Sequence, residues 1–424
     1  PRRRGRPAKR AFDRFEARNS YTAQRLSHVH LTHLTIDQFR SYTHLDVDFD
    51  AGLTLIVGEN GAGKSNLLEA IYALATTRSP RSSTEGELLA WDAPEPAVAR
   101  IAGTAARGDG EVSVELVLVA RTDAQGAVLP SKSGAPLTSK RLRVNGVPRR
   151  ATDVMGQIGA VLFTTHDIEV ITGSPGTRRR YLDFTIAQSD RQYARWFSQY
   201  DKAVTQRNAL LKRIGKGEAS AEELQPWDES VAQGGGAIMA ARAAAIRELQ
   251  TLAAHHHLAV AASDHEYADT LELGYLPALG DAALPEVADP SAIEARIRAG
   301  FTALRPREIG AGTTLVGPHR DDLSIMLQGR SASAYASRAQ QRSVALALRL
   351  AEADLLRQRS GESPVLLLDD VFSELDPQRR TATALALRDA EQVILTTADP
   401  ESVPAELPAA TAAFRVAAGN PLGA

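Results

Sequence analysis

The sequence predicts an α/β fold whose nucleotide-binding core is built from both ends of the chain, with a helical segment inserted between them. Toward the end, residues 365–368 form an apolar strand followed by two carboxylates, Asp369 and Asp370. Near the start lies a loop that matches in full the pattern that cradles phosphates: Gly58, Glu59, Asn60, Gly61, Ala62, Gly63, Lys64 and Ser65. Neither motif can hydrolyse a nucleotide alone, so the two ends must fold together.

The composition is that of a globular protein of two or three domains. The 424 residues are 43% hydrophobic and 24% charged, which is ordinary globular usage. No apolar stretch approaches the roughly 20 residues that span a bilayer, and no hydrophobic signal-peptide region follows the basic N-terminus. We therefore expect a soluble, cytoplasmic protein without a membrane partner. The absence of cysteine excludes disulfides, thiolate metal sites and cysteine nucleophiles.

The net charge of −2 hides an asymmetry. Residues 1–27 carry nine Lys or Arg against Asp13 and Glu16, a balance of +7, which leaves −9 for the remainder. This segment lacks hydrophobic periodicity, so we predict a basic disordered tail. The composition of this tail is compatible with a solvated segment and also with a segment that contacts a DNA groove. A polyanion that does not bind the tail would have to bind local basic patches, because the net negative charge of the remaining residues repels it.

Strands and a helix are predicted around the phosphate loop. Residues 30–39 and 44–49 alternate between apolar and polar, and residues 53–57 are continuously apolar, as in a strand buried on both faces. After the loop, apolar residues recur at helical spacing from Leu67 to Leu74. The loop therefore lies between a strand and a helix, as phosphate binding requires.

Two more strands are predicted at 112–119 and 141–144. The second ends at Asn145-Gly146, a strong signal for a hairpin turn. We divide the whole chain into a tail (1–27), the N-terminal part of an ATPase head (28–185), a helical arm (186–305) and the C-terminal part of the head (306–424).

The arm is predicted to be helical because runs typical of strands nearly vanish there. Helices such as 237–258 dominate, and we expect breaks at Gly234-Gly235-Gly236 and over residues 274–290, which are rich in Pro, Asp and Gly. Heptads are not sustained for four repeats, so no long coiled coil is expected.

After Arg305-Pro306 the pattern predicts a return to strands at 314–316 and 323–327, and then a helix from Ser337. A strand at 393–396 completes the core next to the strand at 365–368. The helix between them, residues 377–389, has a clear start, with Asp376 as its cap and Pro377 in its first turn.

The two motifs predict a site for ATP and Mg²⁺. Backbone N–H groups of the loop and the dipole of the following helix surround the phosphates, and Lys64 places its charge on the outer phosphates. Ser65 offers its hydroxyl to Mg²⁺, and Asp369 holds the ion through water. Asp370 is placed to orient or polarise the attacking water.

A third element precedes the carboxylate strand. Ser337 caps a helix with Gln340 three residues later, and a helix N-terminus is also an anion site. Capping alone is the default interpretation of such a pair. The order of elements along the chain favours an anion site in addition to capping. This order is phosphate loop, insertion, Ser-x-x-Gln helix start, carboxylate strand, and then a segment that ends at Asp376.

That order is the plan of ABC-type ATPases. Further segments narrow the resemblance, most strongly Gly317-Pro318-His319-Arg320-Asp321-Asp322-Leu323 and the run over residues 366–376, and also residues 36–42, 66–72, 78–81, 161–163 with Asp167, 179–183 and 206–208. In these segments the sequence resembles the RecF family of DNA-repair proteins, and the resemblance extends from about residue 30 to 400.

The resemblance implies an ATP-gated dimer. Ser337 and Gln340 would contact the γ-phosphate of ATP held by a second, head-to-tail subunit, and Asp376 would lie in the loop that crosses the dimer seam. It further implies a weak DNA-dependent ATPase that dimerises on gapped or junction DNA in recombinational repair, replication restart and the SOS response. Expected partners are RecR, RecO and RecA.

The chain departs from the family at Ala339, where glycine is usual. Its methyl group crowds a place where phosphate would approach closely. The resemblance also places Thr397 where transporters carry a histidine, and residues 164–167 where they carry a glutamine. Arg81 is compatible with either a phosphate contact or a solvated position.

Basic clusters offer DNA contacts, although solvated faces or internal ion pairs explain them equally well. They are Arg141, Arg143, Arg149 and Arg150, and Arg178, Arg179 and Arg180. Residues 255–257 are three histidines that we interpret as a polar helix face.

Two other functions stay open. One is an ABC transporter nucleotide-binding subunit, against which the arm and the Gly317 motif argue. The other is a nuclease-linked ABC-type ATPase, for which no second cluster of metal-binding residues is evident.

Overall fold

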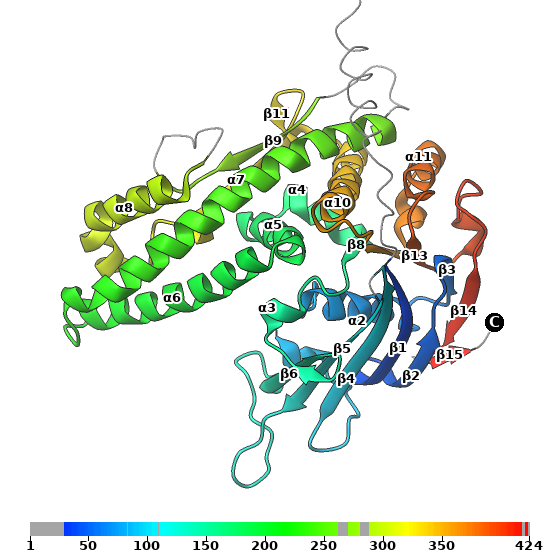
Figure 1. The fold of residues 1–424 in the computed structure, drawn as a ribbon, viewed down its shortest axis with the longest axis horizontal. Coiled ribbons are helices and arrows are strands. Elements are labelled where there is room, and N and C mark those ends of the chain that lie inside the picture. Colours follow the sequence, from blue (N-terminus) through cyan, green and yellow to red (C-terminus); the bar gives the residue numbers. More distant parts are fainter. Residues whose placement is uncertain are drawn as a thin grey trace, which may run out of the picture.

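The protein consists of a head with two large sheets and an elongated helical arm (Figure 1). The computed structural model describes residues 29–82, 84–108, 110–261, 270–279, 288–417 and 420–422. The predicted tail at 1–27, and with it the question of its DNA contact, lies outside the described residues. No helix in these ranges is long and apolar enough to cross a membrane.

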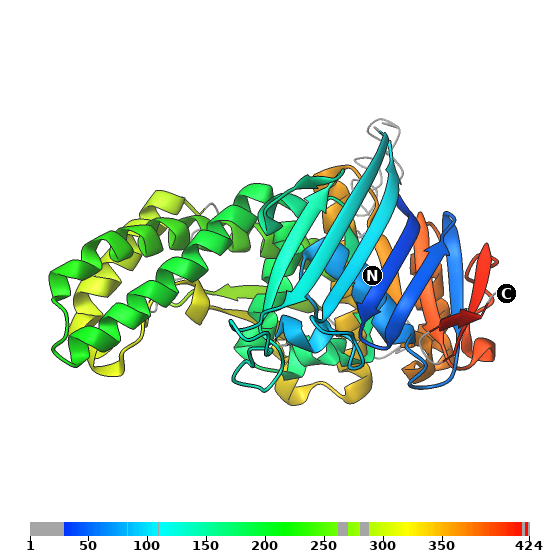
Figure 2. The ribbon, with the colours of Figure 1, turned by 90° about the horizontal axis from the view of Figure 1, so that it is seen from below.

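The first sheet is antiparallel, with strand order β2-β1-β4-β5-β6-β7. One face packs on α2 (Lys64–Thr76) in a shared apolar core, and no helix of the described residues covers the other face (Figure 2). Asn145 and Gly146 both have positive φ, 51° and 74°, as a hairpin turn of type I′ requires. The strands are β1 (His30–Phe39), β2 (Tyr42–Asp48), β4 (Val98–Arg107), β5 (Gly110–Ala120), β6 (Thr138–Val144) and β7 (Val147–Pro148).

The second sheet brings the two ends of the chain together. Its order is β15-β14-β3-β13-β12-β8, and all neighbours except β14 and β15 are parallel. The carboxyl ends of β3 and β12 therefore lie on the same edge, which confirms the predicted head. The strands are β3 (Gly52–Val57), β8 (Ala160–Thr164), β12 (Val365–Asp369), β13 (Gln392–Thr397), β14 (Ala412–Ala417) and β15 (Asn420–Leu422).

Helices flank this sheet much as expected. Ser337 caps α10 (Arg338–Ser360), and Asp376 caps α11 (Pro377–Leu387). The remaining helices of the head are α3 (Ala151–Val154), α4 (Glu169–Thr172), α5 (Pro175–Ser189) and α9 (Ala332–Tyr335). Short 3₁₀ turns are η1 (Glu85–Leu88), η2 (Thr165–Ile168), η3 (Ala221–Leu224), η4 (Pro318–Arg320), η5 (Val371–Glu374) and η6 (Pro400–Ser402).

The arm is formed by three long helices: α6 (Arg191–Gly215), α7 (Gln225–Ala261) and α8 (Pro290–Ala311). The predicted break at Gly234-Gly235-Gly236 is wrong, because α7 runs through all three glycines. A Cβ on Gly235 would lie 2.7 Å from Ile297 Cδ1, and one on Gly236 would lie 2.5 Å from Pro290 O. The glycines allow α8 to pack close to α7, and this packing outweighs their low helix propensity.

The arm was predicted to span residues 186–305, and its last helix, α8, continues through Pro306 to Ala311. The predicted strand at 314–316 is absent. The N–H and hydroxyl of Thr314 instead both donate to Asn208 Oδ1, at 2.7 Å each, so a side chain of α6 replaces a strand partner. An antiparallel sheet of β9 (Leu271–Leu276), β10 (Asp322–Leu327) and β11 (Arg330–Ser331) forms here, and of its strands only β10 was expected.

Substitution of the arm glycines tests the packing of α7 on α8. Gly236→Ala is expected to lower the melting temperature, because its methyl group meets backbone atoms and overpacking costs about 1–3 kcal/mol. Gly234→Ala is the matched control: its nearest contacts, at 3.5 Å to Tyr200, are ordinary, and alanine favours a helix. Circular dichroism melts of both variants measure the difference, and equal melting temperatures would contradict close packing at Gly236.

Candidate nucleotide site

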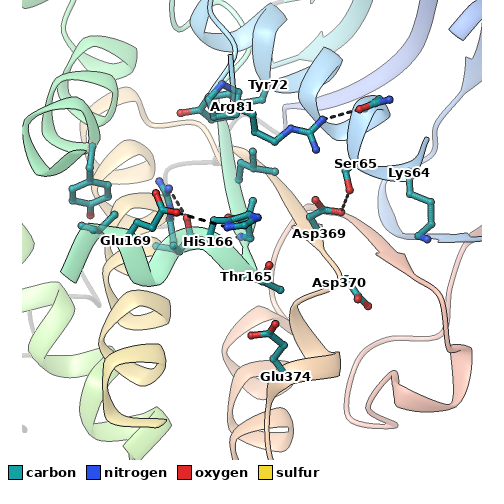
Figure 3. A pocket seen from close by; sticks show the side chains of 18 of the residues that line it. Lys64, Ser65, Tyr72, Arg81, Thr165, His166, Glu169, Asp369, Asp370 and Glu374 are labelled. Atoms are coloured by element: carbon teal, nitrogen blue, oxygen red, sulfur yellow. Dashed lines mark hydrogen bonds and ion pairs between the residues drawn. The ribbon is translucent and has the colours of Figure 1, made fainter. Parts of the chain in front are cut away.

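A cavity of about 820 Å³ opens at the carboxyl edge of the second sheet (Figure 3). Its walls come from the phosphate loop, the end of β12, the 164–167 segment and one face of α5. Five of the eight predicted loop residues line it: Asn60, Gly61, Gly63, Lys64 and Ser65. The volume and the residue types suit a nucleotide with its phosphates at the loop.

The loop needs its glycines for conformation and for space. Gly61 and Gly63 have φ of 83° and 109°, values that side chains other than glycine rarely adopt. A Cβ on Gly63 would lie 2.8 Å from Ser41 Oγ, and one on Gly58 would lie 2.5 Å from Val416 O. The loop is thus held between the β1–β2 turn and β14, with its N–H groups at the start of α2.

Lys64 lies folded back over the loop. Its ammonium donates to Gly58 O at 2.7 Å and to Glu59 O at 2.9 Å. Burial lowers the pKa of Lys64, while the nearby Asp370 and Asp369 act to raise it. The charge is therefore held at the loop where outer phosphates would lie.

Ser65 and Asp369 are brought into direct contact from opposite ends of the chain. Ser65 Oγ donates to Asp369 Oδ1 at 2.8 Å (Figure 3). Thr396 Oγ1 donates to the same oxygen at 2.9 Å. A hydroxyl next to a carboxylate is an oxygen donor set that Mg²⁺ accepts. The arrangement fits the predicted ion, whose binding by these residues stays a prediction.

Asp370 follows at the turn out of β12. Its φ of 52° is left-handed, and its N–H donates to Thr396 O at 3.1 Å, so the backbone turns sharply there. Burial raises the pKa of its carboxyl group. A carboxylate of raised pKa in a nucleotide cavity suits the orientation or polarisation of water.

The other predicted residues lie outside this cavity. Gln340 N–H donates to Ser337 Oγ at 3.2 Å and Ser337 N–H to Gln340 Oε1 at 2.8 Å, a reciprocal cap at the start of α10. Asp376 accepts from Arg379 N–H at 2.9 Å and pairs with its guanidinium. None of the three lines the cavity that holds Lys64 and Asp369.

Arg81 lines the cavity but is held by protein partners. It pairs with Glu69 and donates to Asn66 Oδ1 at 2.7 Å. Glu69 is buried, which raises its pKa, but hydrogen bonds from Arg40 and Arg81 outweigh burial and leave the pKa lowered. Glu69 on α2 thus fixes Arg81 at the cavity wall.

Sequence reasoning missed an ion cluster in the wall of the cavity, which Arg349 and Asp167 line. Arg349 on α10 donates at 2.7 Å to both Asp167 Oδ1 and Glu352 Oε2, and Glu352 is fully buried. The cluster could have been predicted from charged residues on the apolar face of the helix that follows Ser337, because such residues are rarely buried unless they are paired.

The basic clusters separate into internal and exposed groups. Arg178 makes two bonds to Asp322, at 2.6 and 2.8 Å, and Arg179 donates to Asp321 O at 2.6 Å, which favours internal bonding among the alternatives left open for these two. Arg180 lines the nucleotide cavity, and Arg143 pairs with Glu115.

Arg149 and Arg150 are exposed and line a second groove of about 870 Å³ between the first sheet and α6. Lys140, Arg195 and Lys202 line the same groove. Among the three histidines, His256 bonds to Asp354 at 2.7 Å and His257 is buried.

Comparison with known proteins places this geometry in a family. The family described as RecF/RecN/SMC N terminal domain matches residues 30–406. The DNA replication and repair protein RecF of Roseiflexus castenholzii is 41% identical over 378 residues, which cover 87% of this chain and 93% of that protein. That of Chloroflexus aggregans is 40% identical over 403 residues, with 92% and 99% covered.

Solved structures agree. The recombination mediator protein RecF-ATP in the RecFOR pathway is similar to this chain with a TM-score of 0.78 and 29% identity, and the match covers 93% of this chain and 98% of that one. The corresponding RecF-ATPrS structure has the same TM-score and identity.

Two substitutions separate binding from hydrolysis. Lys64→Ala is expected to abolish ATP binding, because it removes the ammonium held at the loop. Asp370→Asn keeps the shape of the side chain but weakens polarisation of water, so ATP stays bound and turnover falls by about 100-fold or more. Calorimetric titration with ATP and phosphate release measure the two effects.

Lys212→Ala, an exposed change on α6, is the control for loss of a lysine. Wild-type affinity in Lys64→Ala, or unchanged turnover in Asp370→Asn, would contradict the respective roles.

Proposed function

This chain belongs to the RecF family, and we propose that it acts in DNA replication and repair as an ATP-gated dimer on DNA. The observation that carries the proposal is the position of the Ser337 helix start. It is capped and exposed, and it lies outside the cavity that holds Lys64, Ser65 and Asp369. Identity to RecF proteins over most of the chain favours this function over the transporter and nuclease-linked alternatives.

The start of α10 is an anion site that lies outside the chain's own nucleotide cavity, so a nucleotide in that cavity would not occupy it. N–H groups at the start of α10 are available to phosphate oxygens, and the helix dipole favours negative charge there. Gln341 is buried and donates to Ala332 O at 3.2 Å, so the segment before Ser337 is fixed against α10. A second copy, arranged head to tail, would place this rigid helix start over the γ-phosphate at the partner's loop.

Within such a dimer, each residue of the cavity has a task. Lys64 and the loop N–H groups hold the phosphates, and Asp370 orients water. Ser65 and Asp369 would hold Mg²⁺, which when bound neutralises charge on the β- and γ-phosphate oxygens. We propose that hydrolysis is weak, depends on DNA, and resets the dimer.

DNA would lie in the groove between the first sheet and α6. Arg149, Arg150 and Lys202 are exposed there, whereas Lys140 pairs with Glu85 and Arg195 with Asp153. A local basic groove is what a chain of net negative charge needs in order to meet a polyanion. Gapped or junction DNA, RecR, RecO and RecA are the proposed substrate and partners.

Blocking the Ser337 helix start tests the dimer. Ser337→Arg adds bulk and charge on a surface outside the chain's own cavity, so ATP binding by the monomer should stay at wild-type strength. The ATP-induced dimer should weaken by about tenfold or more, because the partner's γ-phosphate can no longer reach the helix start. Sedimentation velocity with and without ATP gives the dimer dissociation constant.

Thr302→Arg places the same charge on an exposed position of α8 and should dimerise normally. Weakened ATP binding together with unchanged dimerisation in Ser337→Arg would rule out contact across the subunits.

Charge removal in the groove tests the DNA surface. The triple variant Arg149→Gln, Arg150→Gln, Lys202→Gln should bind duplex DNA more weakly and with a shallower salt dependence, by about 0.9 in slope for each phosphate that the variant no longer neutralises. Arg141→Gln is the control, because β6 alternates and this exposed side chain points away from the groove residue Lys140. Fluorescence anisotropy over a salt series measures both. An unchanged slope in the triple variant would exclude the groove.

A further inference from the structure

Arg379 is a buried arginine in the first turn of α11, only 8% exposed, at the contact between α11 and α10. Its Nε donates to Ser343 Oγ on α10 at 2.9 Å. Its Nη1 pairs with Asp376, whose other carboxylate oxygen accepts the N–H of Arg379 at 2.9 Å. One guanidinium thus joins the loop that contains Asp376 to the helix that begins after Ser337.

The connection continues to the first turn of α10. Ser343 Oγ, which accepts from Arg379, donates in turn to Ala339 O at 3.1 Å. Ser343 is itself buried. A continuous series of hydrogen bonds therefore runs from the Asp376 carboxylate, through Arg379 and Ser343, to the backbone two residues after Ser337.

Charge keeps this connection in place. A buried guanidinium is costly unless it is paired, and Asp376 supplies a carboxylate that pairs with Arg379. Partial burial acts to raise the pKa of Asp376, but the hydrogen bonds from the Arg379 N–H and guanidinium outweigh it and lower the pKa. The Asp376 carboxylate therefore stays ionised near neutral pH.

A second pair between the same segments is weaker. Arg342 on α10 lies 2.6 Å from Glu374, but the two side chains are 41% and 39% exposed. Solvent screens such a pair, so it contributes little to rigidity. In the Arg379–Asp376 pair the carboxylate is 42% exposed, but the guanidinium is only 10% exposed and also donates to the buried Ser343.

The arm also reaches this point. α7 packs against both α10 and α11, and His257 near its end is buried. Burial, together with the charge of Arg379, lowers the pKa of His257 to about 4, so the imidazole is neutral beside the guanidinium. The 37-residue α7, about 55 Å long, thus runs from the arm to the Arg379 contact.

We propose that Arg379 is a positioning residue of the composite ATP site, which fixes Asp376 and the first turn of α10 as one rigid face for the partner subunit's nucleotide. The proposal rests on the proposed function, because this face meets a nucleotide only in an ATP-bound dimer. Loss of Arg379 frees the two segments to move independently, so ordering them on dimerisation becomes more costly.

The test compares Arg379→Met with Arg388→Met, which removes an exposed arginine at the other end of α11. In Arg379→Met, ATP affinity of the monomer should match wild type, the ATP-dependent dimer should weaken about tenfold, and kcat should fall without a change in KM for ATP. Arg388→Met should behave as wild type. Calorimetry, sedimentation velocity and phosphate release supply the measurements.

A double-mutant cycle adds a readout that a general loss of stability does not produce. Ser343→Ala should weaken the dimer by itself, and its effect should largely disappear in the Arg379→Met background, because both changes break one series of hydrogen bonds. Additive effects would overturn the proposal. Arg379→Lys retains the charge near Asp376 but cannot serve both partners, and should restore dimerisation only in part.

The outcomes distinguish a failure of the proposed ATP-gated dimer from a failure of the role of Arg379. A wild-type protein that stays monomeric with ATP would overturn the proposed function and remove the premise for Arg379. A wild-type dimer that Arg379→Met matches in strength would overturn the role of Arg379 alone. If Arg379→Met does not fold, Ser343→Ala decides, because it removes a single hydroxyl, and normal dimerisation in that variant would overturn the proposal.

Discussion

The central constraint in this molecule is the pairing of β13 between β3 and β12. In that register, Thr396 lies opposite both Ile56 and Asp369, so the end of the strand before the phosphate loop is aligned with the carboxylate strand. Thr396 then bonds to the Asp369 side chain and to the Asp370 backbone. At the other end of β13, Gln392 exchanges hydrogen bonds with the backbone of Leu31 and so fixes the first sheet to the second. The geometry of the site follows from this alignment.

Much of that framework could be predicted from the sequence, because it depends on local patterns. Glycine spacing, a continuously apolar strand and the Ser337–Gln340 cap each act within a few residues, and each lies where it was expected. The arm differs because its structure depends on distant partners. Glycines that would weaken an isolated helix instead admit α8, and Pro306 lies within a helix whose buried Glu308 pairs with Arg207 at 2.7 Å.

Buried charge was the least predictable property. The Gly317 motif stands out in the sequence, but its role is visible only in three dimensions: His319 bonds to Tyr200 at 2.6 Å, Asp321 lies 3.5 Å from Arg242, and Asp322 pairs with Arg178. Burial lowers the pKa of His319 to about 4, so it is neutral. These contacts join the arm to the head through paired polar groups, and removal of one partner from such a pair costs about 3–5 kcal/mol.

The division of the predicted site into two surfaces has a mechanical consequence. Lys64, Ser65 and Asp369 are held by the parallel sheet, whereas Ser337 and Asp376 begin helices on another surface and are joined through Arg379 and Ser343. In the proposed dimer, two surfaces that are each held by their own contacts would have to gain little order when they meet around a nucleotide. Ala339 fits this arrangement: it adopts a helical conformation in the first turn of α10, and its carbonyl accepts the Ser343 hydroxyl. Alanine restricts the backbone more than glycine does, which favours a helix start that is already ordered in the single chain, before the proposed partner would bind.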